Sequence, residues 1–266
     1  MKYHLLVDNW STVNKFISDP LYSYNMSCIL DGVWVRDIPE VPNDGDVATG
    51  LDPALLTLKI MELAPKISEL GVGVFGTGYW TQATLVRSIS SLIELSDSNF
   101  KINIGLGSGD KKDILEKCGV HLQNRQNIFT DSWDRVIKNS VKLRRNSNSC
   151  AFWVATRKID LIKDMPNVNG LLIPTMSINS LNKIRCSFSE ENIPRIGMLL
   201  RVIPDMENIN FGKGKATSVL QGSPDFLSGI IKGLEGYVDD IILSIETENP
   251  LILYEFLSEL IRTLRD

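Results

Sequence analysis

Short runs of β-forming residues alternate with amphipathic helical stretches along the whole chain, and this order restricts the possible folds most. Eight runs favour strands: residues 3–7, 27–35, 72–75, 101–106, 151–155, 170–173, 195–201 and 240–243. Helical spacing of apolar residues is clearest at 53–63, 81–95, 132–143, 225–234 and 250–264. This alternation predicts an α/β protein with a parallel sheet, and eight units predict closure into a (β/α)8 TIM barrel. An open doubly wound sheet is the alternative.

The chain length fits one such barrel, because single barrels commonly contain about 250 residues and this chain has 266. No internal repeat, low-complexity tract or linker divides the sequence. We therefore expect one domain over residues 1–266, and two small domains stay open as an alternative.

The charge balance and the apolar runs indicate a cytoplasmic protein. With 28 basic and 32 acidic residues, the net charge of -4 gives no support for binding nucleic acid. Asp8 interrupts the N-terminus before a signal-peptide core could form, and no later run approaches the roughly 18 apolar residues that cross a bilayer. The expected partner is a small-molecule substrate, without nucleic acid or membrane, and a homodimer stays open.

Cysteine and histidine are too few and too scattered to favour a metal centre or a Ser-His-Asp triad. The cysteines at 28, 118, 150 and 186 form no C-x-x-C pair, and we expect them to be buried thiols. Only His4 and His121 offer imidazoles, and no G-x-S-x-G motif is present. We expect no metal.

Two successive predicted strands end in glycine-rich sequence. Residues 101–113 read KINIGLGSGDKKD, and residues 72–80 read VGVFGTGYW. Glycine lets a ligand approach the backbone, and ligands of α/β proteins gather at strand ends. A tight turn before a helix would explain either segment alone, whereas two neighbouring segments favour a shared cofactor site.

Two further glycine patterns carry less weight. Gly71, Gly73 and Gly76 match the dinucleotide fingerprint G-x-G-x-x-G, but they run through the predicted strand itself, and no acidic residue ends a second strand at the usual distance. We interpret this match as accidental. The segment FGKGK at 211–215 lacks phosphate-loop spacing, and we assign it to a loop after the seventh strand.

Charged residues close the second and fifth predicted strands. Thr156, Arg157 and Lys158 follow an apolar run, where cations and a helix N-terminus could hold a phosphate. A helix start with ordinary surface charges is the alternative. Arg36 and Asp37 follow the second strand near the expected barrel mouth, where an exposed salt bridge is the alternative.

Taken together, these strand ends resemble the bacterial luciferase-like monooxygenase superfamily, over most of the chain. The resemblance rests on VWVRD at 33–37, GTG at 76–78, ELS at 94–96 leading to IGLGSGD at 104–110, and GSPDF at 222–226 followed by GYVDD at 236–240. Within the superfamily, the sequence is most similar to methylenetetrahydromethanopterin reductase, through GLGSGDKKD and the following Gly119-Val120. The resemblance implies a TIM barrel that binds FMN or the deazaflavin coenzyme F-420.

The resemblance also implies a role for each motif. Asp37 and the bulge at 76–79 would lie beside the tricyclic ring, residues 107–109 would run under the ring, and residues 155–158 would hold the phosphate. The implied cofactor-binding residues are Asp37, Gly76, Thr77, Gly78, Tyr79, Gly107, Ser108, Gly109, Ala155, Thr156, Arg157 and Lys158. A non-proline cis peptide is expected between Gly78 and Tyr79, since relatives carry such a bond in this bulge.

The chain departs from the family pattern at several positions. The usual histidine after Asp37 is Ile38, the glutamate expected in the first strand is replaced by Leu6 with Asp8 nearby, and the loop after GTG is short. The glycines that relatives use after the fifth strand are absent. These departures raise the alternative of a shortened, non-catalytic flavin-binding protein.

The sequence thus favours an oxidoreductase that passes a hydride between coenzyme F-420 or FMN and a small organic substrate. Asp110 and Asp37 are the expected catalytic residues. Asp110 could instead be the N-cap of a helix at 111–117, a position that aspartate favours. An unrelated barrel lyase or isomerase acting on a phosphorylated sugar is a further alternative, although no lysine sits convincingly at a strand end, where a Schiff-base lysine would lie.

Overall fold

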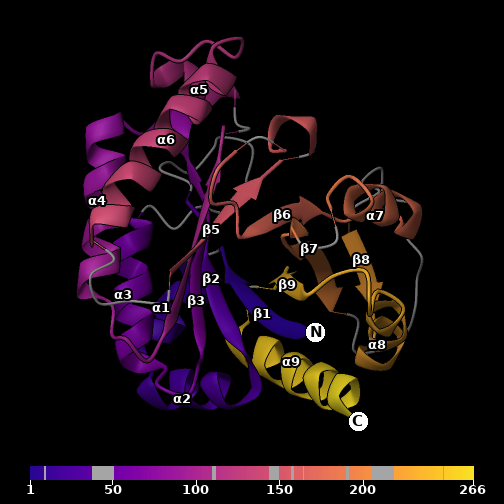
Figure 1. Cartoon of the computed structure of the whole chain (residues 1–266). Coiled ribbons are helices and arrows are strands. Elements are labelled where there is room, and N and C mark those ends of the chain that lie inside the picture. Colours follow the sequence, from indigo (N-terminus) through magenta and orange to yellow (C-terminus); the bar gives the residue numbers. More distant parts are fainter. Residues whose placement is uncertain are drawn as a thin grey trace.

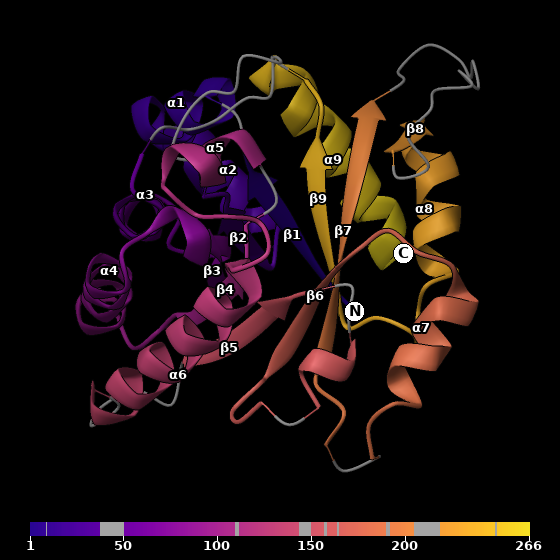
Figure 2. The same ribbon diagram turned by 90° about the horizontal axis from the view of Figure 1, so that it is seen from above.

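Eight parallel strands close into a barrel surrounded by helices (Figure 1, Figure 2). The computed structural model describes residues 1–8, 10–37, 51–109, 112–143, 150–156, 159–163, 165–189, 192–204, 219–247 and 249–266. The barrel strands are β1 (Lys2–Val7), β2 (Gly32–Val35), β3 (Glu69–Gly76), β4 (Lys101–Gly107), β5 (Cys150–Ala155), β6 (Gly170–Pro174), β7 (Arg195–Pro204) and β9 (Asp240–Ile245). Closure follows because β9 pairs in parallel with both β1 and β7. The predicted TIM barrel is confirmed.

An additional short strand, β8 (Val219–Gly222), pairs with the carboxyl end of β7. The sequence did not predict it, because VLQG is short and lacks strand alternation. The second strand also starts later than predicted. Its first predicted residues, 27–29, belong to helix α2 (Pro20–Ile29), which begins at the N-cap Asp19, and the strand itself starts at Gly32.

Helices cover the outside of the barrel, and most begin at a capping side chain. They are α1 (Trp10–Ser18), α2, α3 (Pro53–Leu63), α4 (Gln82–Leu95), α5 (Lys112–Lys117), α6 (Arg125–Leu143), α7 (Ile178–Arg185), α8 (Pro224–Lys232) and α9 (Pro250–Arg265). Asp52 accepts hydrogen bonds from the backbone N–H groups of Ala54 and Leu55, which stabilises the start of α3. Of the described helices, none combines the length and hydropathy that a membrane span needs.

Two hydrophobic clusters hold the barrel together. The larger one lies between the strands and the helices, and the smaller one fills the barrel lumen around Trp34 and Trp153. These two rings meet edge to face, with centroids 5.4 Å apart. A Cβ at Gly71 would lie 2.6 Å from the Trp34 ring, so this glycine is needed for packing. The G-x-G-x-x-G pattern therefore lies within β3, as predicted, and not in a phosphate loop.

The irregularity of β3 lies earlier than predicted. The pairing between β3 and β4 shifts register between Val72 and Phe75, and the cis peptide joins Gly73 to Val74. The expectation of a cis bond between Gly78 and Tyr79 was wrong. Thr77–Tyr79 instead form a short 3-10 turn, η1, directly after the strand.

The cysteines are free but not buried, which corrects the expectation. Cys28, Cys118 and Cys186 are exposed, and Cys150 is half-buried. Cys28 lies on α2 and Cys186 caps the end of α7, positions that leave these side chains on the outer layer of helices. The segment 211–215 lies outside the described residues.

Candidate functional site

A cavity of about 820 Å³ opens at the carboxyl ends of the barrel strands. Barrel enzymes place their active sites at this end. The cavity floor consists of apolar side chains that point into the lumen: Leu6, Trp34, Val74, Leu172, Leu199 and Ile242. The wall above the floor differs from one side to the other, with small residues on one half and charged residues on the other.

The half formed by β3, β4 and β5 is lined by small residues. Gly76 and Gly107 are register partners, so the two glycine-rich strand ends lie side by side on the same rim, as predicted. The Tyr79 ring packs against Gly76 and Gly109 and joins the two turns. A Cβ at Gly107 would lie 2.9 Å from Val74 Cγ2 and 3.5 Å from Ala155 Cβ. Glycine at position 107 therefore lets β4 approach Val74 and Ala155 closely.

Asp37 lies at the border of this half. Its carboxylate accepts hydrogen bonds from the Gly76 backbone N–H at 3.0 Å and from Trp80 Nε1 at 2.7 Å. Asp37 is 6% exposed, and this burial raises the pKa of its carboxyl to about 6, although the two hydrogen bonds oppose the shift. Asp37 is therefore a buried group that can change protonation close to neutral pH, and not a member of an exposed salt bridge.

The opposite half is formed by β2, β1, β9 and β7, and it is charged. Ser244 Oγ donates a hydrogen bond of 2.6 Å to the Asp8 carboxylate. Burial raises the pKa of Asp8, while the Ser244 hydroxyl and the charges of Arg36 and Arg201 act in the other direction. Arg36 and Arg201 both line the cavity.

The arginines differ in their partners. Arg201 Nη2 pairs with Glu246 Oε1 at 2.6 Å, in a largely exposed salt bridge. Within the described residues, the Arg36 guanidinium makes no hydrogen bond or salt bridge. Arg125, from the start of α6, also lines the cavity and reaches the Gly109 carbonyl at 3.4 Å. The cavity thus has two cations, Arg36 and Arg125, that form no salt bridge with the described residues.

The structure places most of the predicted site residues at this cavity. Eight of them line it: Asp37, Gly76, Tyr79, Gly107, Ser108, Gly109, Ala155 and Thr156. Thr77 and Gly78 are buried behind the wall. Asp110, Arg157, Lys158 and Ile38 lie outside the described residues.

Sequence reasoning missed the charged half of the cavity as a site. Asp8 and Arg36 were noted individually, but Ser244 and Arg201 carry no local motif. The alternation of side chains along a strand could have indicated them, because residues two apart face the same side. Arg201 lies two residues after the lumen-facing Leu199 on β7, and Ser244 lies two residues after Ile242 on β9. Each pair continues an apolar lumen position with a polar one at the barrel mouth.

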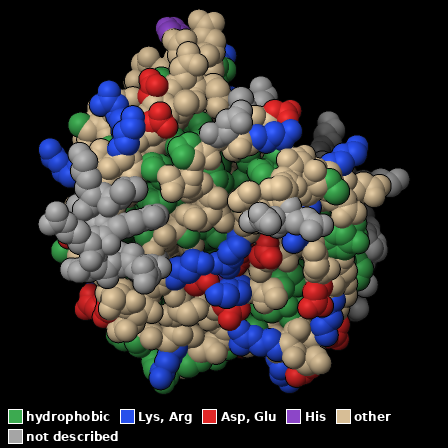
Figure 3. Space-filling model, viewed as in Figure 1, with side chains coloured by type: hydrophobic (Ala, Val, Ile, Leu, Met, Phe, Trp, Pro, Cys, Tyr) green, Lys and Arg blue, Asp and Glu red, His purple; other side chains and the backbone are tan. Residues whose placement is uncertain are grey.

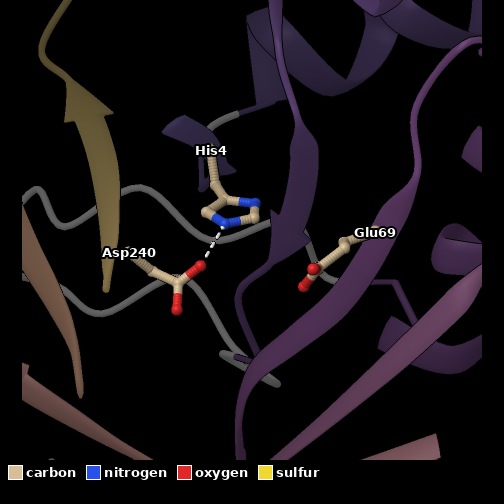
Figure 4. A group of neighbouring side chains, drawn as sticks. All are labelled: His4, Glu69 and Asp240. Atoms are coloured by element: carbon tan, nitrogen blue, oxygen red, sulfur yellow. Dashed lines mark hydrogen bonds and ion pairs between the residues drawn. The ribbon is translucent and has the colours of Figure 1, made fainter. Parts of the chain in front are cut away.

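A second polar cluster lies at the opposite, amino-terminal end of the barrel. His4 Nε2 hydrogen-bonds Asp240 Oδ1 at 2.8 Å, and Glu69 lies on the other side of the imidazole (Figure 4). Histidine, glutamate and aspartate can all ligate a metal, and the potential ligand atoms of these three buried residues lie within 4.8 Å of one another. However, Arg195 binds both carboxylates and Lys2 binds Glu69, so each carboxylate already has a cationic partner, while Asp240 Oδ2 and His4 Nδ1 are buried with no hydrogen-bond partner among the described residues. Lys and Arg side chains gather near the start of β1 on the face shown in Figure 3.

The polar cluster at the amino-terminal end of the barrel has a structural role. Burial alone would raise the pKa of Glu69, but hydrogen bonds and charges from Lys2, Arg195, Asn103 and Lys101 hold it at about 2. Asn103 also accepts a hydrogen bond from Trp153 Nε1 at 2.9 Å. This network positions Trp153 in the lumen and closes the amino-terminal end of the barrel.

Comparison with known proteins identifies the fold. No protein-family model matches the chain. A probable nitronate monooxygenase from Bacillus subtilis (strain 168) is 30% identical over 125 residues, which cover 43% of this chain and 36% of that protein. The matched part therefore spans only about a third of this curated relative.

Solved structures match over nearly the whole chain. An F-420-dependent secondary alcohol dehydrogenase in complex with an F-420-acetone adduct has a TM-score of 0.73 at 9% identity, with 100% of this chain and 99% of that chain covered. The coenzyme F-420-dependent tetrahydromethanopterin reductase from Methanopyrus kandleri has a TM-score of 0.67 at 11% identity, covering 99% and 98%.

The oxygenating constituent of 3,6-diketocamphane monooxygenase from Pseudomonas putida, in complex with FMN, has a TM-score of 0.66 at 12% identity, covering 98% and 96%. These matches show that the chain shares its parallel barrel with F-420-dependent and FMN-containing oxidoreductases, as the sequence resemblance led us to expect of the fold.

Proposed function

We propose that this protein is an oxidoreductase that binds FMN or coenzyme F-420 at the barrel mouth and exchanges a hydride with a small organic substrate. The observation that carries the proposal is the small-residue half of the cavity, where Gly76 and Gly107 are neighbours on one rim. Solved structures of the same fold hold an F-420-acetone adduct or FMN.

The cavity fits a flavin-type ring in size and in lining. Its volume of about 820 Å³ lies within the range of roughly 300–1,000 Å³ for ligand sites. The floor is apolar, and a Cβ at Gly107 would take up space beside Val74. Trp34 lines the cavity, and its Nε1 is buried with no hydrogen-bond partner in the described part of the chain.

In this proposal the cofactor supplies the hydride chemistry, while the protein supplies position and electrostatics. The backbone at the ends of β3 and β4 would lie against the ring plane. Asp37, with a pKa of about 6, would hold or release a proton beside the reacting groups. On sequence grounds, Asp110 is a second candidate for proton transfer, and Arg157 and Lys158 are candidates for the cofactor phosphate.

Titration of the purified protein with FMN and, separately, with coenzyme F-420 tests the proposal through the change in cofactor fluorescence. Saturable binding of either compound supports it, and the tighter ligand identifies the cofactor. Subsequent oxidation of the reduced cofactor by small organic compounds would support turnover. Binding that never leads to turnover would instead favour the non-catalytic flavin-binding alternative, and absence of binding to both would contradict the proposal.

A further inference from the structure

The polar residues of the charged half come from four neighbouring strands. Arg201 and Ser244 are register partners across β7 and β9. Val7 pairs with Val35, so Asp8 and Arg36 follow as the next residues on β1 and β2. The small-residue half, in contrast, comes from β3, β4 and β5. A ring placed over Gly107 would leave the charged half for a second molecule.

The charges of this half favour an anion. Arg36 has no anionic partner in a hydrogen bond or salt bridge among the described residues. Arg201 shares its charge with Glu246, but the two side chains are 48% and 36% exposed, so Arg201 can also turn towards a ligand. The carboxylate of Asp8 in this half already accepts a hydrogen bond from Ser244, so it is only partly available to the two arginines.

The shape of the half favours a particular kind of anion. A guanidinium is a planar fork of donors that matches the two oxygens of a carboxylate. Directly below these groups, Leu6, Leu199 and Ile242 give an apolar floor. A molecule with a carboxylate head and an aliphatic body satisfies both surfaces.

From this juxtaposition, we propose that the organic substrate of this protein is an aliphatic carboxylate, whose head binds Arg36 and Arg201 and whose chain lies on Leu6, Leu199 and Ile242. This inference rests on the proposed function, because it assigns to the substrate the half that the cofactor leaves free.

The test uses hexanoate and its neutral analogue hexanamide as probes, with binding to the cofactor-loaded protein measured by calorimetry. We expect hexanoate to bind at least about tenfold more tightly than hexanamide, the size expected for hydrogen bonds to a charged group. Arg36→Gln and Arg201→Gln should each weaken hexanoate binding by about tenfold and leave cofactor binding unchanged. Arg87→Gln, on the exposed face of α4, is the matched control and should change neither.

Equal binding of the two probes would overturn the inference, and so would wild-type hexanoate affinity in both cavity variants. Cofactor affinity lost in these variants, with hexanoate binding intact, would assign the arginines to the cofactor. The comparison of hexanoate with hexanamide on the unaltered protein stays decisive if a variant does not fold. If neither FMN nor coenzyme F-420 binds, the proposed function fails, and the same titration of the cofactor-free chain still decides whether a carboxylate site exists.

Discussion

The backbone N–H of Gly76 donates a hydrogen bond of 3.0 Å to the carboxylate of Asp37 and so ties the end of β2 to the end of β3. Trp80 Nε1 reaches the same carboxylate oxygen at 2.7 Å. One buried acid therefore fixes the rim on which the first glycine-rich turn lies, and it does so while lining the cavity.

Replacing Asp37 with Ala should destabilise the protein, because two donors lose their acceptor. We expect a loss of about 1–3 kcal/mol in the free energy of unfolding, the cost of leaving buried donors unpaired. Urea denaturation followed by circular dichroism measures it. Asp225→Ala, at an exposed position of α8, is the control and should stay within about 0.5 kcal/mol of the wild type. An equal effect of the two substitutions would contradict the bridging role.

The pH dependence of stability should also report on Asp37. Its folded-state pKa of about 6 lies above the unfolded value of 3.8, so the folded state binds more protons between these values. Stability relative to Asp37→Asn should therefore fall by up to about 3 kcal/mol as pH rises from about 4 to above 6. Asp8, whose pKa is also raised, is present in both proteins and cancels in the difference. A difference that does not vary with pH would show that Asp37 is not perturbed.

Glu69→Gln tests the polar cluster at the amino-terminal end of the barrel. The pKa of Glu69 is lowered to about 2, so its contribution to stability is present above about pH 4.5 and is lost as pH falls towards 2. We expect a loss of about 2–3 kcal/mol at pH 7, the low end for a broken buried ion pair, because Lys2 and Arg195 are partly exposed.

The matched control for this variant is Glu62→Gln, which breaks an exposed pair with Lys59 and should cost under about 1 kcal/mol. Thermal unfolding at pH 7 and at pH 3 measures both variants. If the Glu69→Gln variant were destabilised as little as the control, the polar cluster around Glu69 would not hold the barrel together.

Arg157 and Lys158 carry a prediction that rests on the sequence. If they hold the cofactor phosphate, replacing both with Ala should weaken FMN or F-420 binding by roughly 2–3 kcal/mol, as charge-assisted hydrogen bonds are lost. Lys66→Ala combined with Arg87→Ala removes the same charge from exposed positions outside the cavity and serves as the control. Unchanged affinity in the Arg157 and Lys158 double variant would place the phosphate elsewhere.

The sequence was sufficient for the barrel and for one half of the site. Eight alternating units allow few topologies, and parallel strands bring the ends of successive strands together, so the neighbouring turns at Gly76 and Gly107 could be predicted. The start of the second strand could not, because residues 27–30 at the end of α2 fit a strand as well as a helix, and Asp31 alone separates them from Gly32.

The charged half could not be predicted because it depends on contacts between residues at opposite ends of the chain. Asp8 and Ser244 are 236 residues apart and meet only because β9 closes the barrel against β1. The pairs His4 with Asp240 and Glu69 with Arg195 arise from the same closure. No local sequence pattern predicts such contacts, whereas each glycine-rich turn is recognisable from a few consecutive residues.

The most direct test of the account is a cofactor titration of Gly107→Leu beside the wild type. A side chain at Gly107 would enter the space next to Val74 and Ala155, whereas Gly229 has no atom near its Cβ position and lies on α8, so Gly229→Leu is the matched control. We predict saturable binding of FMN or coenzyme F-420 by the wild type and by Gly229→Leu, with at least a hundredfold loss in Gly107→Leu while its unfolding remains cooperative. Equal affinity in all three proteins would contradict a cofactor site at the barrel mouth.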